Sequence, residues 1–129
     1  MVALYNTGWS YFEEGELEEA ETLFAEVIEL AQQRGWREGV LFPLEALATV
    51  ASRRGEAEGA AELLGAAAAM REQLGQDDSR VAEETLAVRA ALGESRFFQA
   101  FNDGSRMPLQ AAIARALESA HHAAGPGAS

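Results

Sequence analysis

Residues 15–24 read GELEEAETLF and residues 55–64 read GEAEGAAELL, so one short pattern returns after 40 residues. Both copies begin with a glycine and an acid, and both then carry a second acid, an alanine and a pair of apolar residues in the same order. A pattern that recurs at a fixed period is typical of repeat architectures. The sequence therefore predicts two copies of one structural unit.

Each copy contains two apolar stretches of helical periodicity with a glycine between them. The first unit, about 2–35, is expected to hold helices at 4–14 and 17–34, and the second, about 37–75, helices at 41–54 and 57–74. Gly15 and Gly55 stand where a helix ends in a left-handed residue, a conformation that costs glycine little. Because such short turns join antiparallel neighbours, each unit is predicted to be a helical hairpin.

The second helix of the first unit indicates how the hairpins are arranged. Its apolar residues recur at spacings of three and four and form one broad stripe, namely Leu17, Ala20, Leu23, Phe24, Val27, Ile28 and Ala31. The glutamates at 18, 19, 26 and 29 fall between them and should face solvent. A single partner helix cannot cover so wide a stripe, so successive hairpins are expected to stack as a solenoid.

These residues resemble the tetratricopeptide repeat. With Gly8 at the small position of the first helix, Tyr11, Ala20 and Phe24 fall on the aromatic, small and aromatic positions of that repeat. The second unit matches at Leu44, Leu47, Ala48, Ala60 and Leu64. The resemblance implies an all-α, tetratricopeptide-like solenoid of about seven helices in a right-handed superhelical stack. The long period of 40 is similar to the variant repeats of MalT-like regulators.

A second resemblance covers the later part of the chain. Its segments are LLGAA at 63–67, MRE at 70–72, AALGE at 90–94, the pair Phe98 and Phe101 before Gly104, LQAAI at 109–113, and Ala116 with Leu117. This ordered set resembles the end of the repeat region in large LuxR-type and MalT-like bacterial transcriptional regulators. The resemblance implies a non-catalytic module that relays or restrains a signal by contacting a protein partner or another domain of the parent regulator.

The chain departs from a regular repeat in two places. Pro43 removes a helical hydrogen bond, so the helix around it is expected to bend or to begin near Leu41. The third unit, 78–121, is expected to be an irregular cap with helices at about 78–92, 94–101 and 108–120, the first capped by Asp77, Asp78 or Ser79. We expect one domain over 1–121 and a disordered tail over 122–129.

Composition excludes several classes of function. Cysteine is absent, which removes disulfides and thiolate nucleophiles. A net charge of −11 without any lysine argues against direct contact with nucleic acid. No apolar run approaches the roughly 18 to 20 residues that a membrane span needs, and the N-terminus lacks the order of a signal peptide. We therefore expect a cytoplasmic protein that does not engage a membrane.

The sequence contains few residues whose type and spacing could support catalysis. His121 and His122 are adjacent, so on a helix they point about 100 degrees apart and cannot share a metal ion. The glutamate run over 13–19 is expected to be a solvated face, and the glycines at 35 and 39 lack the lysine of a phosphate loop. We predict no catalytic, cofactor-binding or metal-binding residue, and no cofactor.

The function class that remains is the binding of a protein or a small molecule. In tetratricopeptide solenoids the first helix of each pair lines the concave surface, which here implies a binding face of Tyr5, Asn6, Trp9, Phe12, Glu13, Glu45, Thr49 and Arg53. Tyr5 and Trp9 have a second interpretation, as packing against the neighbouring helix. The lysine and asparagine set that clamps a peptide carboxylate in some tetratricopeptide domains is missing. An alternative function is small-molecule, or inducer, sensing on the concave face.

Phe97, Phe98 and Phe101 also leave two interpretations open. Adjacent residues on a helix point about 100 degrees apart, so a single narrow core face cannot take all of these rings. Either the last helix, with Ile113 and Leu117, folds back over them, or they form an edge for association with the parent protein or with a second copy in a homodimer.

Overall fold

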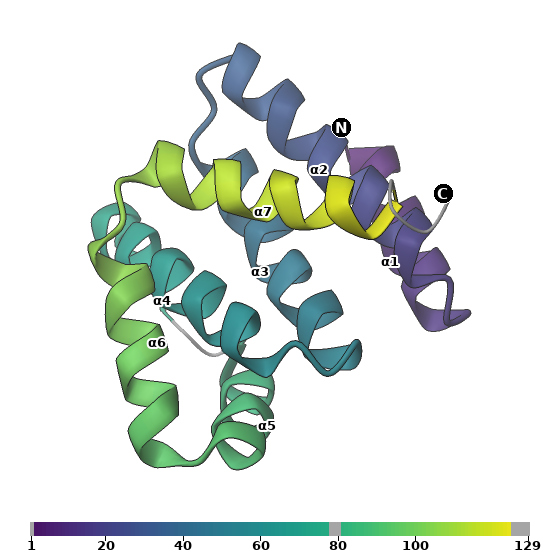
Figure 1. The fold of residues 1–129 in the computed structure, drawn as a ribbon. Coiled ribbons are helices and arrows are strands. Elements are labelled where there is room, and N and C mark those ends of the chain that lie inside the picture. Colours follow the sequence, from purple (N-terminus) through teal and green to yellow (C-terminus); the bar gives the residue numbers. More distant parts are fainter. Residues whose placement is uncertain (1, 78–80, 125–129) are drawn as a thin grey trace.

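The computed structural model describes residues 2–77 and 81–124, with side chains as far as residue 116. Seven helices occupy these residues: α1 (Val2–Glu13), α2 (Leu17–Gln33), α3 (Glu38–Arg53), α4 (Ala57–Leu74), α5 (Ala82–Leu92), α6 (Glu94–Arg106) and α7 (Leu109–Ala124). The predicted all-α helical-repeat fold is confirmed (Figure 1). Within the described residues, no helix has the length and apolar character needed to cross a lipid bilayer.

The first four helices form two stacked hairpins, because α1 packs along α2, α3 packs along α4, and α2 also packs along α3. The two hairpin turns are built alike. Gly15 and Gly55 have φ angles of 82° and 85°. The amide of Glu16 donates to the Tyr11 carbonyl over 2.9 Å, and the amide of Glu56 donates to the Ala51 carbonyl over 2.9 Å. The 40-residue period is therefore preserved down to single hydrogen bonds.

The core repeats with the same period. Ala20 and Phe24 of α2 are fully buried, and so are their counterparts Ala60 and Leu64 of α4, which are at most 2% exposed. The glutamates that interrupt the apolar stripe of α2, at 18, 19, 26 and 29, are exposed, as predicted. Burial of this stripe against α1 and α3 provides the main stabilisation of the first hairpin.

Of the two expectations for the helix around Pro43, the start near Leu41 is wrong. The helix neither stops nor restarts there, since it runs from Glu38 to Arg53 and begins three residues before the predicted start near Leu41. Pro43 lacks the amide that would donate to the Gly39 carbonyl. Leu41 and Leu44, close to it in the helix, are fully buried. Burial of this segment offsets the missing hydrogen bond.

The last three helices do not form another hairpin of the same kind. Helix α5 begins at Ala82, later than predicted, and Asp78 and Ser79 lie outside the described residues. Helix α6 packs on α4 more extensively than α5 does, and α7 crosses back over α2, α3 and α4 (Figure 1). Helix α7 continues to Ala124, beyond the predicted helix end near residue 120, and residues 125–129 of the predicted tail lie outside the described part.

The predicted end of α6 at Phe101 is also wrong, because the helix continues through Gly104 to Arg106. A Cβ atom on Gly104 would lie 1.9 Å from the Glu62 carbonyl oxygen of α4. A Cβ atom on Gly65 would lie 2.0 Å from the Phe101 carbonyl oxygen of α6. These two glycines therefore allow the backbones of α4 and α6 to touch, and Gly104 is a packing residue and not a helix terminator.

Candidate functional site

Three of the predicted face residues, Tyr5, Trp9 and Phe12, form an aromatic cluster with Phe24 of α2. The Trp9 ring lies 5.2 Å from the Phe12 ring and 5.2 Å from the Phe24 ring, in edge-on contact with both. Tyr5 makes a similar contact with Trp9 at 6.2 Å. Each of the three is half-buried. The rings therefore pack against the neighbouring helix on one side and reach the surface on the other.

Gly8 explains how α1 approaches this cluster. A Cβ atom at position 8 would lie 2.7 Å from the Phe24 ring, so a side chain there would displace the ring. Gly8 is the buried residue of α1. It therefore fills the small position that the tetratricopeptide resemblance assigns to it.

Arg53 connects the aromatic cluster to the second hairpin. Its guanidinium carbon lies 4.7 Å from the centre of the Phe12 ring, a cation–π contact between α3 and α1. Asn6 and Glu13 are exposed on α1, and Arg53 is exposed at the end of α3. We call Asn6, Trp9, Phe12, Glu13 and Arg53 the α1/α3 face. It offers an amide, a carboxylate, a guanidinium and two aromatic rings at the surface.

Glu45 does not belong to an exposed face, contrary to the sequence prediction. It is 5% exposed, and its Oε2 lies 2.6 Å from Nη1 of Arg71 on α4, which is itself 9% exposed. Thr49 is half-buried, and its hydroxyl donates to the Glu45 carbonyl over 3.3 Å. The Glu45–Arg71 pair holds α3 against α4, whereas the Thr49 bond lies within α3. A lone acid inside the apolar run over 40–50 is the signal that could have indicated a buried ion pair.

A second ion pair joins α2 to the end of α3. Glu21 is 6% exposed, and its Oε1 lies 2.6 Å from Nη2 of Arg54. Burial raises the pKa of Glu21 from 4.5 to about 7, against the attraction of Arg54 and with help from the negative charges of Glu56 and Glu18. The folded state therefore disfavours the charged form of the Glu21 carboxyl relative to the neutral form.

The raised pKa of Glu21 predicts a pH-dependent stability. The folded state binds the proton more tightly than the unfolded chain, so the stability contribution of Glu21 should increase as the pH falls from 8 to 5. Relative to a Glu21→Gln variant, the free energy of unfolding of the wild type should rise by about 2 kcal/mol over this range. Urea denaturation at several pH values measures the difference. Glu26→Gln, at an exposed position on the same helix, is the control for the loss of one negative charge. A constant difference for Glu21→Gln over this pH range would contradict the prediction.

The three phenylalanines of α6 have different environments. Phe97 is 3% exposed, Phe101 is half-buried, and Phe98 is 46% exposed with the Arg89 guanidinium 5.0 Å from its ring. Helix α4 packs along α6 and covers its buried side, with Gly65 against the Phe101 backbone. One of the two interpretations placed the last helix over these rings, but Ile113 of α7 is buried near α2 and α3. Phe98 remains at the surface as the predicted association edge would require.

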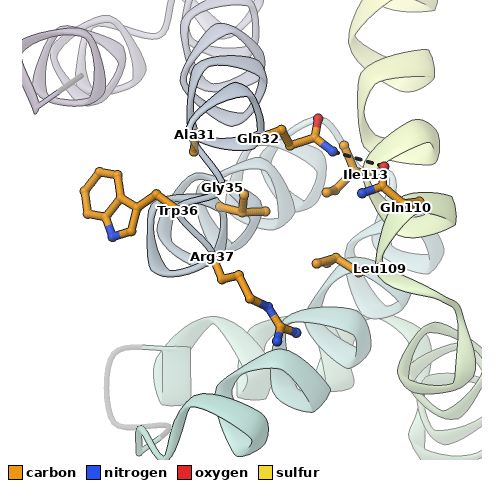
Figure 2. A pocket seen from close by; sticks show the side chains of 9 residues that line it. Ala31, Gln32, Gly35, Trp36, Arg37, Leu109, Gln110 and Ile113 are labelled. Atoms are coloured by element: carbon orange, nitrogen blue, oxygen red, sulfur yellow. Dashed lines mark hydrogen bonds between the residues drawn. The ribbon is translucent and has the colours of Figure 1, made fainter.

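A pocket lies between the α2–α3 turn and the start of α7. Its volume is about 130 Å³, and it is lined by Ala31, Gln32, Gly35, Trp36, Arg37, Val40, Leu109, Gln110 and Ile113. Figure 2 shows Leu109, Gln110 and Ile113 facing the turn from α7. The pocket exists because α7 folds back over the first hairpin, a long-range contact that the helical periodicity does not encode. None of its residues belongs to the predicted binding face.

The two histidines lie on α7, in the stretch where only the backbone is described. The prediction that they do not share a metal ion therefore stays a prediction.

Comparisons with known proteins match one part of the chain. Residues 2–34, which include α1 and α2, match the family model of the tetratricopeptide repeat. No curated protein matches the chain. No solved structure matches it either. The match agrees with the hairpin packing, with Gly8 against Phe24, and it supports a tetratricopeptide-like region.

Proposed function

We propose that this chain is a non-catalytic protein-interaction and signal-relay module, and that it is the C-terminal repeat segment of a LuxR-type or MalT-like bacterial transcriptional regulator. Tetratricopeptide repeats generally mediate contacts between proteins, which supports the first part. The ordered segments between residues 63 and 117 support the second. In this proposal residues 1–121 act as one domain in the cytoplasm.

The α1/α3 face carries the proposal. Its half-exposed Trp9 and Phe12 rings lie beside the exposed Arg53 guanidinium, which is 4.7 Å from the Phe12 ring. Tryptophan and arginine are the residue types that contribute most to binding energy at protein interfaces. The rings are already held by their neighbours, so little conformational entropy would be lost when a partner binds.

The expected partner is a protein or another domain of the parent regulator. The chain has a net charge of −11, so direct contact with a phosphate backbone would be electrostatically unfavourable. The exposed Arg53 guanidinium beside the Phe12 ring would favour a partner with a carboxylate next to an apolar patch. A homodimer through the Phe98 edge is a further arrangement that this proposal allows.

The inducer-sensing alternative finds less support in the geometry. The pocket beside α7 has a volume of about 130 Å³, below the roughly 300–1,000 Å³ that is usual for drug-sized ligands. The aromatic residues of the α1/α3 face pack against each other, so they do not surround a hollow. Thermal-shift screening of metabolites against the wild type and Trp9→Ala tests the alternative, which predicts ligand-dependent stabilisation of the wild type.

The proposed function can be tested in two steps. The coding sequence on either side of this segment should contain a nucleotide-binding core or a helix-turn-helix domain. The flanking domain, produced separately, should bind this chain in isothermal titration calorimetry, and Arg53→Glu should weaken the affinity by about tenfold, or about 1.4 kcal/mol.

Glu29→Arg is the matched control, because Glu29 is exposed on α2 and lies outside the α1/α3 face. It should leave the affinity within about twofold of the wild type. Flanking sequence that encodes neither domain would overturn the regulator assignment. Equal binding by wild type and Arg53→Glu would overturn the role of the α1/α3 face.

A further inference from the structure

The pocket beside α7 has an apolar floor and a polar rim. Ala31 of α2, Val40 of α3 and Ile113 of α7 are each at most 3% exposed, and Leu109 is half-buried next to them. Three helices that are distant in sequence therefore contribute apolar surface to one hollow. Gln32, Gln110 and Arg37 surround its opening with hydrogen-bonding groups (Figure 2).

The two glutamines on the rim are joined by a hydrogen bond. The Gln32 side-chain amide donates from Nε2 to Oε1 of Gln110 over 3.1 Å, across 78 residues of sequence. A primary amide has both donor and acceptor capacity, so this bond leaves the Gln32 oxygen to accept and the Gln110 nitrogen to donate. The amide pair thus presents one acceptor and one donor at the pocket opening. A peptide group offers the complementary N–H and C=O.

The charge at this opening differs from that of the chain as a whole. The first 33 residues contain no base, and Arg34 and Arg37 are the first cations of the sequence. The Arg37 guanidinium is held over the rim by its hydrogen bond to Oε1 of Gln73, 2.6 Å long. Arg37 is the one charged residue among those that line the pocket. A carboxylate on a ligand would be attracted to this position.

The size of the hollow limits what can enter it. An apolar protein cavity of roughly 150 Å³ binds a molecule as large as benzene. A pocket of about 130 Å³ therefore has room for one branched aliphatic or one aromatic side chain, and not for a whole metabolite of ordinary size. The Trp36 side chain, 44% exposed, points away from the opening in Figure 2 and packs over Gly39.

We propose that this pocket binds an extended, acidic segment of a protein partner. The segment inserts one leucine- or phenylalanine-sized side chain between α2, α3 and α7, pairs a backbone peptide group with the Gln32–Gln110 amides, and places an adjacent carboxylate near Arg37. The proposal rests on the proposed function as an interaction module. It adds a second contact site, separate from the α1/α3 face, and specifies the chemistry of what binds there.

The test uses three capped tetrapeptides: glycine-leucine-aspartate-glycine, the same peptide with serine for leucine, and the same peptide with lysine for aspartate. Titration followed by ¹H–¹⁵N NMR should show saturable shifts at residues 35–40 and 109–113 for the first peptide, with a dissociation constant on the order of 1 mM. The serine peptide should bind about tenfold more weakly, and the lysine peptide several-fold more weakly.

Gln110→Ala should weaken binding of the leucine-aspartate peptide by about tenfold, and Gln32→Ala should do the same through the other half of the amide pair. Gln33→Ala is the control, since Gln33 is exposed at the same helix end and outside the pocket lining. It should bind as the wild type does. Gln110 is exposed, so its replacement should leave the melting temperature nearly unchanged.

Three outcomes would overturn the pocket assignment: no saturable binding by any peptide, equal binding of the serine peptide, or full affinity in both glutamine variants. Binding of the flanking regulator domain provides the separate readout. If that domain binds through the α1/α3 face while the peptides do not bind, the proposed function stands and the pocket assignment fails. If the leucine-aspartate peptide binds and the flanking domain does not, the pocket assignment stands and the regulator assignment fails.

Discussion

Replacing Gly104 with alanine should lower the free energy of unfolding by about 3 kcal/mol, because the added methyl group has no space between α6 and α4. Its carbon would lie 1.9 Å from the Glu62 carbonyl oxygen and 2.7 Å from the carbonyl carbon. Both atoms belong to the backbone of α4, so no side-chain rotation can relieve the overlap. Helix α6 must move away from α4, on which it packs extensively. Urea denaturation followed by circular dichroism measures the loss.

Gly59→Ala is the matched control for this prediction. Gly59 also lies inside a helix, α4, but a Cβ atom there would meet nothing within 4 Å. Alanine has the higher helix propensity, so Gly59→Ala should stabilise the protein by about 0.5–1 kcal/mol. Gly65→Ala should behave like Gly104→Ala, because its Cβ would lie 2.0 Å from the Phe101 carbonyl oxygen. If all three variants had similar stabilities, the close approach of α4 and α6 would be wrong.

The glycines also show which parts of the fold local sequence could predict. At Gly15 and Gly55 the glycine is followed by an acid and a new apolar stripe, and the structure has a left-handed turn at each. Gly104 has the same identity but lies inside a helix, where the neighbouring backbone requires it. Local sequence cannot distinguish these two uses of glycine, because the second depends on the backbone at Glu62, which is far away in the sequence. The two hairpins were therefore predictable, and the end of α6 was not.

The candidate site was also predictable only where local sequence determines the position of a residue. The positions of Trp9 and Phe12 on α1 follow from helical spacing, and both are at the surface of the first hairpin. Glu45 was assigned to the same face by spacing alone, but its charge is buried and paired with Arg71. The pocket beside α7 was not predicted, because it depends on the direction in which α7 folds back. Spacing assigns a residue to a side of its helix, and long-range packing determines whether that side is exposed.

The two buried ion pairs link successive helices of the stack. Glu21 with Arg54 joins α2 to the end of α3, and Glu45 with Arg71 joins α3 to α4. A buried charge pair is rarely more stabilising than a well-packed apolar pair of the same size, but it penalises any arrangement that separates the partners. These pairs would therefore favour one particular stacking of the hairpins over a shifted one.

Replacing Arg71 with methionine should lower the free energy of unfolding by about 3–5 kcal/mol. Methionine keeps most of the apolar volume of the arginine stem, so the loss is mainly electrostatic. The Glu45 carboxylate, 5% exposed, would lose the guanidinium that lies 2.6 Å away and would remain in an apolar environment. Chemical denaturation at pH 7 measures the effect. Part of the loss should be recovered at pH 5, since a carboxyl that has lost its cation takes up a proton more readily.

The double variant Glu45→Leu with Arg71→Met separates loss of the pair from loss of packing. It removes both charges and keeps similar volume, so it should recover most of the stability that Arg71→Met loses, giving a coupling energy of about 2 kcal/mol or more. Arg89→Met is the surface control: its partner Glu94 is largely exposed, and removal of that pair should cost less than about 1 kcal/mol. A double variant as unstable as Arg71→Met would mean that the arginine acts by packing alone. In that case the junction between α3 and α4 would not depend on charge, and the preference for one stacking of the hairpins would have to come from the repeated apolar core.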